Sequence, residues 1–202
     1  PMLIGTVGFM LGTGGSAIVG ITLGEGDEDK ANRYFSLFVL AAFLAGVALS
    51  VLGLFILRPV AILMGAKGEM LDFAVRYGRV LMVSVPTFIL QNMFQSFFVT
   101  AEKPTLGFWF TVGAGCTNMV LDVVLVGWLR WGVEGAAIAT FLSQIVGGVL
   151  PVFYFLDHKT TSRLHLGKTE FHGSVLKAAC INGSSELMTN LSMSLVNILY
   201  NF

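Results

Sequence analysis

Three polar side chains near the middle of the chain have the types and the spacing that a cation or proton site requires. Asn118 and Asp122 are four residues apart inside an apolar segment, so on a helix they project from one face. Thr140 follows in the next apolar segment, and Trp131 lies midway between Asp122 and Thr140. In an antiparallel hairpin rising about 1.5 Å per residue, both side chains would lie roughly 13 Å from the turn. An amide, a carboxylate and a hydroxyl oxygen at one depth suit a proton or a hard cation. The alternative is a polar contact that only locks the hairpin.

The last apolar segment carries a second acid within a polar stripe. A carboxylate in an apolar span is expensive unless it is protonated, paired or facing water, so Glu186 is a candidate functional group like Asp122. Such a stripe should face a water-filled cavity or other polar helices. A helix lying in the membrane interface is the alternative, but its polar face more often carries Lys and Arg. The stripe comprises Asn182, Glu186, Asn190, Ser194, Asn197 and Asn201.

Two glutamines lie beyond a proline in an earlier apolar segment. Pro86 is expected to kink its helix because proline lacks the backbone N–H and clashes with the preceding turn. Gln91 and Gln95 follow one turn apart. Hydrogen bonding between helices is the simpler interpretation of this pair. The alternative is that they line a substrate cavity together with Asn182 and Asn190.

Nothing in the sequence indicates an enzyme or a bound cofactor. The three histidines, His158, His165 and His172, are spaced by sevens in a polar stretch, where a solvated loop is the better interpretation than a metal site. Zinc-protease, nucleophile-elbow and phosphate-loop motifs are absent. The net charge is zero, which gives no reason to expect a nucleic-acid partner.

The elements that must position these residues are membrane-spanning helices. Charged residues make up only 12% of the chain, about half the share in a soluble domain, and 55% of residues are hydrophobic. Six apolar segments reach the ~20 residues that span a bilayer, which predicts an all-α, polytopic transmembrane bundle of six helices. Continuous apolar runs exclude barrel strands. The segments are 2–23, 34–57, 80–100, 105–129, 136–156 and 174–202.

Glycines and a polar linker suggest how the helices are organised. Gly8, Gly12, Gly20 and Gly24, with Ser16 among them, recur every four residues and should let a neighbouring helix approach the first segment closely. Residues 58–79 are long enough for an interfacial helix before the third span. The polar stretch 157–173 separates the unit 1–156 from the segment 174–202, so we expect five helices in one bundle and the sixth loosely attached. Because both chain ends fall within apolar segments, we expect a fragment of a longer protein.

Four motifs resemble those of the multidrug and toxic compound extrusion (MATE) family, in the MOP superfamily. They are LGEGD at 23–27, AEKP at 101–104, WGVEGAAIAT at 131–140 and NGSSE at 182–186. The resemblance covers essentially the whole chain. It implies that the six segments correspond to helices two to seven of twelve, in two six-helix lobes around a central cavity. Residues 1–156 would be the amino-terminal lobe without its first helix, 157–173 the cytoplasmic inter-lobe linker, and 174–202 the truncated first helix of the other lobe.

The resemblance also implies a function and a site. Family members export organic cations, drugs or metabolites in exchange for Na+ or H+ and are multi-pass proteins of the cell membrane, in prokaryotes the inner membrane. Asn118, Asp122 and Thr140 match the amino-lobe cation site of many prokaryotic members, and Glu186 matches an acid that some members use in the other lobe. An Asp that the family site draws from its first helix has no counterpart in this chain. A lipid-linked oligosaccharide flippase is an alternative but predicts a more basic cavity, and an intramembrane enzyme predicts clustered acids or histidines.

Overall fold

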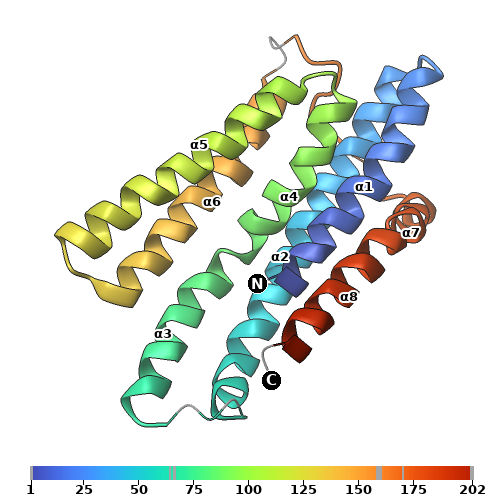
Figure 1. The fold of residues 1–202 in the computed structure, drawn as a ribbon. Helices are drawn as coiled ribbons and strands as arrows, with labels where there is room; N and C mark the ends of the chain where they lie inside the picture. Colours follow the sequence, from blue (N-terminus) through green and yellow to red (C-terminus); the bar gives the residue numbers. More distant parts are fainter. Residues whose placement is uncertain (1, 64, 66, 158–160, 170, 201–202) are drawn as a thin grey trace.

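The computed structural model describes residues 2–63, 65, 67–157, 161–169 and 171–200, and every regular element among them is helical, as predicted. The helices are α1 (Met2–Gly24), α2 (Glu28–Leu63), α3 (Glu69–Val83), α4 (Val85–Thr100), α5 (Pro104–Asp122), the π-helix η1 (Val123–Trp128), α6 (Gly132–Leu156), α7 (Gly173–Asn182) and α8 (Ser184–Tyr200). In the bundle, α1 packs against α4, α2, α7 and α8, and the α5–α6 hairpin lies on the opposite side, against α4 and α3 (Figure 1).

The predicted spans correspond to these helices with some changes at their ends. Four stretches are long and apolar enough to cross a membrane, and α3 with α4 makes a fifth span bent by 48°. The helix expected before the third span is α3, which leads directly into α4 instead of lying apart from it. The sixth predicted segment is helical but broken between α7 and α8, and neither helix alone is long enough to cross a membrane.

The bend between α3 and α4 has a local chemical cause. Pro86 lies at the start of α4 and donates no backbone hydrogen bond, so the helical ladder is interrupted there. The hydroxyl of Thr87 donates to the carbonyl of Ser84 at 2.7 Å, and the hydroxyl of Ser84 donates to Leu81 at 2.8 Å. Side-chain hydroxyls therefore satisfy carbonyls near the break, as a kink inside a membrane requires.

Aromatic rings from three helices form the centre of the bundle. Phe35 of α2 lies 4.9 Å, between ring centroids, from both Phe97 of α4 and Phe155 of α6. All three side chains are fully buried. The outer face of α2 is different, because apolar side chains such as Phe55 are exposed along it, as expected where a helix faces lipid.

The polar linker is packed against the bundle instead of being a free loop. Residues 161–169 of this linker are called the linker strap here. The backbone N–H of His165 donates to the Asn32 side chain at 2.8 Å, and that of Gly167 donates to Ser36 at 2.9 Å. Leu164 and Leu166 of the strap are buried in the core of the bundle. These contacts hold it across the end of α2.

Two of the three histidines lie in irregular backbone, as expected for a loop, but they are less exposed than a fully solvated loop implies. His165 is half-buried in the strap, and the half-buried ring of His172 meets Tyr34 edge-on with centroids 6.1 Å apart. His158 lies outside the described residues.

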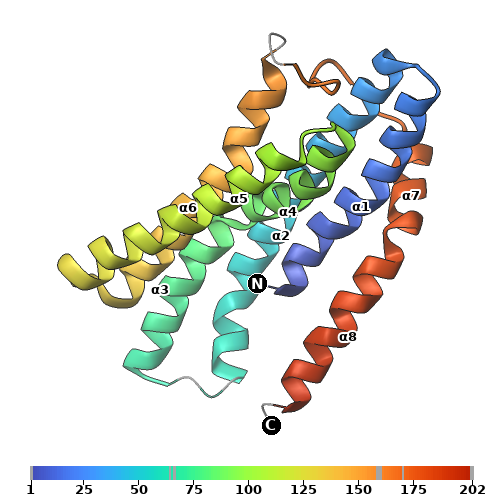
Figure 2. The same ribbon diagram turned by 45° about the horizontal axis from the view of Figure 1, so that its top comes forward.

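The expectation of a loosely attached sixth segment was also wrong. Helices α7 and α8 both lie against α1, on the side away from the α5–α6 hairpin (Figures 1 and 2). A Cβ added at Gly14 of α1 would collide with the carbonyl of Ala179, and one added at Gly183 would collide with the carbonyl of Met10. Missing side chains at these two glycines thus allow backbone to pack on backbone.

Candidate functional site

The candidate site lies in an antiparallel hairpin formed by α5, η1 and α6. Residues 129–131 connect the two arms, and the N–H of Trp131 closes the turn by donating to Leu125 at 2.9 Å. Across the hairpin, Gly135 lies beside Leu125, with 3.2 Å between an added Cβ and the Leu125 Cβ. Farther from the turn, Gly113 lies beside Val146 at 4.0 Å. One pairing register therefore holds along the hairpin.

This register places the three predicted site residues at neighbouring depths. With Leu125 opposite Gly135, Thr140 on α6 lies at a depth between those of Asn118 and Asp122 on α5. All three side chains are half-buried. The Thr140 hydroxyl donates to the carbonyl of Ala136 at 2.9 Å, which leaves its oxygen lone pairs available.

Asp122 has the unusual environment in this hairpin. Its Oδ1 atom is buried and accepts no hydrogen bond from any residue that the structure describes. A buried oxygen without a donor is costly, so such atoms usually meet a proton, a cation or water. The Gln144 Oε1 atom, one helical turn beyond Thr140 on α6, is buried without a partner in the same way. Gln144 was not among the predicted site residues, although its four-residue spacing from Thr140 was visible in the sequence.

The helix changes its hydrogen bonding directly after Asp122. From Val123 to Trp128 the backbone forms a π-helix, and the N–H of Leu129 donates to Val124, five residues back, at 2.9 Å. The π-helix ends this arm of the hairpin, immediately before the connection at residues 129–131. The segment VVLVGW is poor in strong helix formers, since valines lose rotamer freedom in a helix and glycine loses backbone freedom.

The predicted cavity residues of α4 have different environments. Gln91 packs against α6, where its Cδ lies 2.6 Å from a Cβ added at Gly147, as a contact between helices requires. Gln95 is exposed. Their neighbour Asn92, which was not predicted, is buried against α1, and its Nδ2 atom has no partner among the described residues.

Glu186 belongs to a separate site on α8. It is half-buried, and the side chain of Asn190 donates to its carboxylate at 3.4 Å and to its backbone carbonyl at 2.9 Å. Asn182 is exposed at the end of α7. The side chains of Ser194 and Asn197, and all of Asn201, lie outside the described residues. Figures 1 and 2 show α1 and α4 between α8 and the α5–α6 hairpin, so Glu186 and Asp122 do not form one site.

The donor set near Asp122 suits a proton or a hard cation. Within the described ranges, no three His, Cys, Asp or Glu side chains gather as a metal ion with several anionic or imidazole ligands would need. One carboxylate with neutral amide and hydroxyl oxygens is the chemistry that Na+ accepts. Because Asp122 Oδ1 has an unused acceptor position, the residues fit such an ion or a proton on the carboxylate itself.

Known proteins resemble this chain in sequence and in fold. The multidrug export protein MepA of Staphylococcus saprophyticus is 28% identical over 150 residues, covering 74% of this chain and 33% of that protein. MepA of Staphylococcus aureus (strain N315) is 22% identical over 199 residues, 96% of this chain and 43% of that protein. The chain therefore spans a third to under half the length of these relatives, which are named as exporters and not as enzymes.

Solved structures show the same helical arrangement. A multidrug resistance MATE family transporter of the MOP superfamily, in an inward-facing conformation, superposes with a TM-score of 0.88 at 26% identity over 96% of this chain and 44% of that chain. A MATE crystallised with the compound MaL6 gives a TM-score of 0.90 at 25% identity over 99% of this chain and 45% of that chain. The MatE family model matches residues 1–124, more than half of the sequence. The chain is a multi-pass membrane protein segment and belongs to the MatE family.

Proposed function

We propose that this chain forms part of an exporter that moves small organic molecules, such as drugs or metabolites, out of the cell in exchange for Na+ or H+. Membership of the MatE family and relatives named as multidrug export proteins support the transport class. The chain spans less than half of those relatives, so we propose that its activity requires helices beyond the 202 residues. Alternating access needs two halves that can rock around a shared site.

The observation that carries the coupling proposal is the unpartnered Oδ1 atom of Asp122 in a membrane-spanning hairpin. A carboxylate there is tolerated when a cation or a proton neutralises it. A ligand can shift a conformational equilibrium only by its differential affinity for the two states. Asp122 would couple transport if its oxygen is presented to Asn118 and Thr140 in one state and to a different environment in the other. The π-helix that begins at Val123 is a local element whose rearrangement would rotate Asp122.

Substitution of Asp122 in the complete protein tests this proposal. Proteoliposomes would be loaded with a fluorescent organic cation, and release would be driven by an imposed Na+ gradient or, separately, a pH gradient. Asp122→Asn should abolish release under both gradients, because the amide keeps the shape but removes the titratable charge. Asn118→Ala and Thr140→Ala should each weaken the apparent cation affinity by roughly two- to tenfold, the effect of losing one neutral ligand.

Glu134→Gln is the matched control for the loss of charge. Glu134 lies on the same hairpin but at its exposed end, where it pairs with Arg76 at 3.2 Å. An exposed pair of this kind contributes little to stability, so this variant should transport normally. Gradient-driven release that survives in a folded Asp122→Asn protein would refute the assignment.

The two alternative functions have less support. A flippase for anionic lipid-linked sugars would need cations in its cavity, but Asp122 brings a buried carboxylate oxygen to the hairpin. An intramembrane enzyme would need clustered catalytic acids or histidines, and the described residues hold no such cluster. Gln95 and Asn182, both exposed, remain our candidates for a substrate cavity that further helices would complete.

A further inference from the structure

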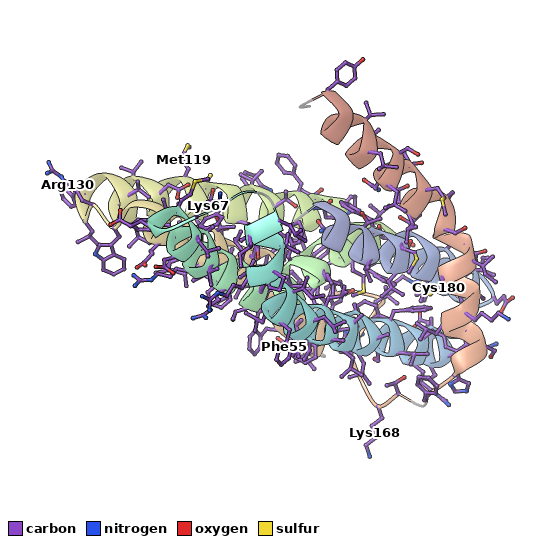
Figure 3. All side chains as sticks on the ribbon, turned by 90° about the horizontal axis from the view of Figure 1, so that it is seen from below. Phe55, Lys67, Met119, Arg130, Lys168 and Cys180 are labelled. Atoms are coloured by element: carbon purple, nitrogen blue, oxygen red, sulfur yellow. The ribbon has the colours of Figure 1, made fainter. Side chains whose placement is uncertain are left out.

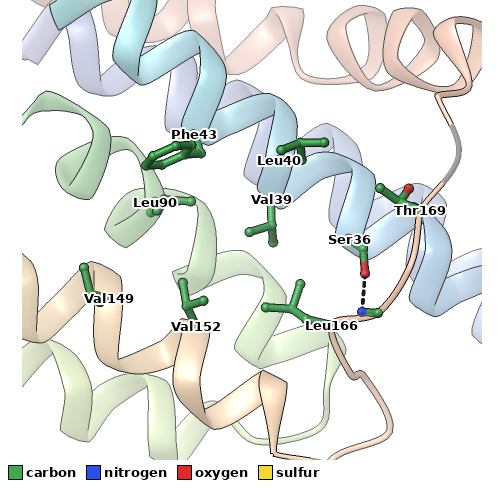
Figure 4. A pocket seen from close by; sticks show the side chains of 10 residues that line it. Ser36, Val39, Leu40, Phe43, Leu90, Val149, Val152, Leu166 and Thr169 are labelled. Carbon is green, nitrogen blue, oxygen red and sulfur yellow. Dashed lines mark hydrogen bonds between the residues drawn. The ribbon is translucent and has the colours of Figure 1, made fainter.

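An apolar groove lies on the outside of the bundle, away from the candidate coupling site. It has a volume of about 430 Å³ and is bounded by α2, α4, α6 and the linker strap (Figure 4). Val39, Leu90 and Leu166 form its buried floor, and Leu40 and Phe43 form a half-exposed rim on α2. Ligand pockets typically have volumes of roughly 300–1,000 Å³, so the groove is large enough to hold a molecule.

The rim of the groove faces the side of α2 that meets lipid. Leu40 and Phe43 are each 46% exposed, and the exposed apolar stripe of α2 continues from them to Phe55. Phe55 and Lys168 lie along the edge of the molecule opposite the far end of α8 (Figure 3). A hydrocarbon chain in the bilayer could therefore enter the groove sideways, without passing through the bundle.

The strap end of the groove becomes polar and carries two cations. A second pocket, of about 510 Å³, shares Leu166 and Gly167 with the groove, and the residues that line it include Arg33 and Lys168. Neither cation forms an ion pair with a described residue. One carboxylate, Asp29, lines the same pocket, which leaves an excess of one positive charge.

Hydrogen bonds hold the strap where the apolar and polar parts meet. The Gly167 N–H donates to Ser36 at 2.9 Å, as drawn in Figure 4, and the Thr169 hydroxyl donates to the carbonyl of Arg33 at 2.9 Å. The N–H of Leu166 donates to the carbonyl of Phe155 at 2.8 Å. The walls of the groove are thus preformed, which lowers the entropic cost of binding.

We propose that this surface binds an anionic phospholipid, with one acyl chain in the groove and the phosphate beside Arg33 and Lys168. The chemistry follows from the joined pockets: the groove buries hydrocarbon, and the two cations offer charge-assisted hydrogen bonds to phosphate oxygens. A zwitterionic lipid would gain less from the excess positive charge. The inference depends on the membrane location of the chain and is independent of the coupling role of Asp122.

Native mass spectrometry of the complete protein tests the proposal. The protein would be reconstituted in equal amounts of phosphatidylglycerol and phosphatidylethanolamine, extracted in mild detergent, and analysed for retained lipid. The wild type should retain phosphatidylglycerol preferentially. The double variant Arg33→Gln with Lys168→Gln should lower this retention roughly fivefold for each cation removed. Val152→Phe, which fills the groove, should lower retention of both lipids at the site.

Two control proteins keep the result specific. Arg58→Gln with Lys67→Gln removes an arginine and a lysine that are exposed at the other end of α2, and Val51→Phe enlarges an exposed valine outside the groove. Both should retain lipid like the wild type. Equal retention by the two charge variants, or by Val152→Phe and Val51→Phe, would overturn the proposal. Equal retention of the two lipids, or displacement of phosphatidylglycerol by inorganic phosphate alone, would also overturn it.

Discussion

The glycines of α1 lead to a prediction about stability. Replacing glycine by alanine should destabilise the protein at one position of this helix and stabilise it at another. Gly8 faces α4 so closely that an added Cβ would lie 2.5 Å from the carbonyl oxygen of Ile89 and 3.1 Å from the Cβ of Asn92. The obstacle is partly backbone, which cannot turn away as a flexible side chain can. Overpacking a well-packed site costs ~1–3 kcal/mol, whereas replacing a helical glycine by alanine gains roughly 0.5–1 kcal/mol. Gly8→Ala should therefore lower the free energy of unfolding by about 1–2 kcal/mol.

Gly20 in the same helix is the matched comparison. An added Cβ there meets only the Thr100 Cγ2 atom, at the ordinary contact distance of 3.7 Å. Gly20→Ala should keep the gain in helix propensity and stabilise the protein by up to ~1 kcal/mol. The free energy of unfolding of the complete protein in mixed micelles, measured by titration with a denaturing detergent, would separate the two variants. Changes of the same sign and size at both positions would refute the reasoning, because helix propensity alone would then explain them.

Two further predictions concern the strap and α8. Hydrogen bonds from Arg163 to Glu102 (3.1 Å) and Glu28 (3.3 Å) raise the pKa of its guanidinium above the ordinary value. A raised pKa adds stability that is lost only as the pH rises through that pKa, so the contribution of Arg163 persists at all physiological pH values. Salt, which screens the ion pairs, is therefore the way to weaken them. Arg163→Ala should make the strap easier to cleave by protease at low salt, and high salt should remove the difference from wild type; a difference that persists in high salt would contradict this explanation. In the transport assay Glu186→Gln should reduce release less than Asp122→Asn, because its carboxylate already has a donor in Asn190, and an equal loss would count against the distinction.

Long apolar runs and proline made the helices and the α3–α4 bend predictable from the sequence. The sequence did not predict how many of the regularly spaced glycines in α1 would pack closely against another helix. A spacing of four residues advances about 40° beyond a full turn at each step, because an α-helix has 3.6 residues per turn. The stripe must therefore drift around α1. Gly8 and Gly12 lie tightly against α4, Gly20 only touches Thr100, and Gly24 has nothing within 4 Å.

The linker strap could not be predicted because its contacts leave no periodic signal. Composition alone suggested a solvated loop, since the stretch is rich in Lys, Thr and His. Its order comes from single tertiary hydrogen bonds to Asn32 and Ser36, which lie more than 130 residues earlier, and from the burial of Leu164 and Leu166. Backbone N–H groups can thus hold a segment in place even when most of its side chains are of the polar types that are common in solvated loops.

The acid at the centre of the candidate site was visible in the sequence, but its orientation was not. A carboxylate in a long apolar run is conspicuous, and the turn near residue 131 fixed its approximate depth. Which way Asp122 faces depends on η1, because one extra residue per hydrogen-bonded turn rotates α5 relative to the turn of the hairpin. The sequence of η1 shows only weak helix formers, which would equally fit an ordinary α-helical turn held by packing. The depth of a residue in the membrane depends on its distance along the chain from the turn, which can be counted in the sequence. The direction in which its side chain points depends on the helical register, which tertiary contacts decide.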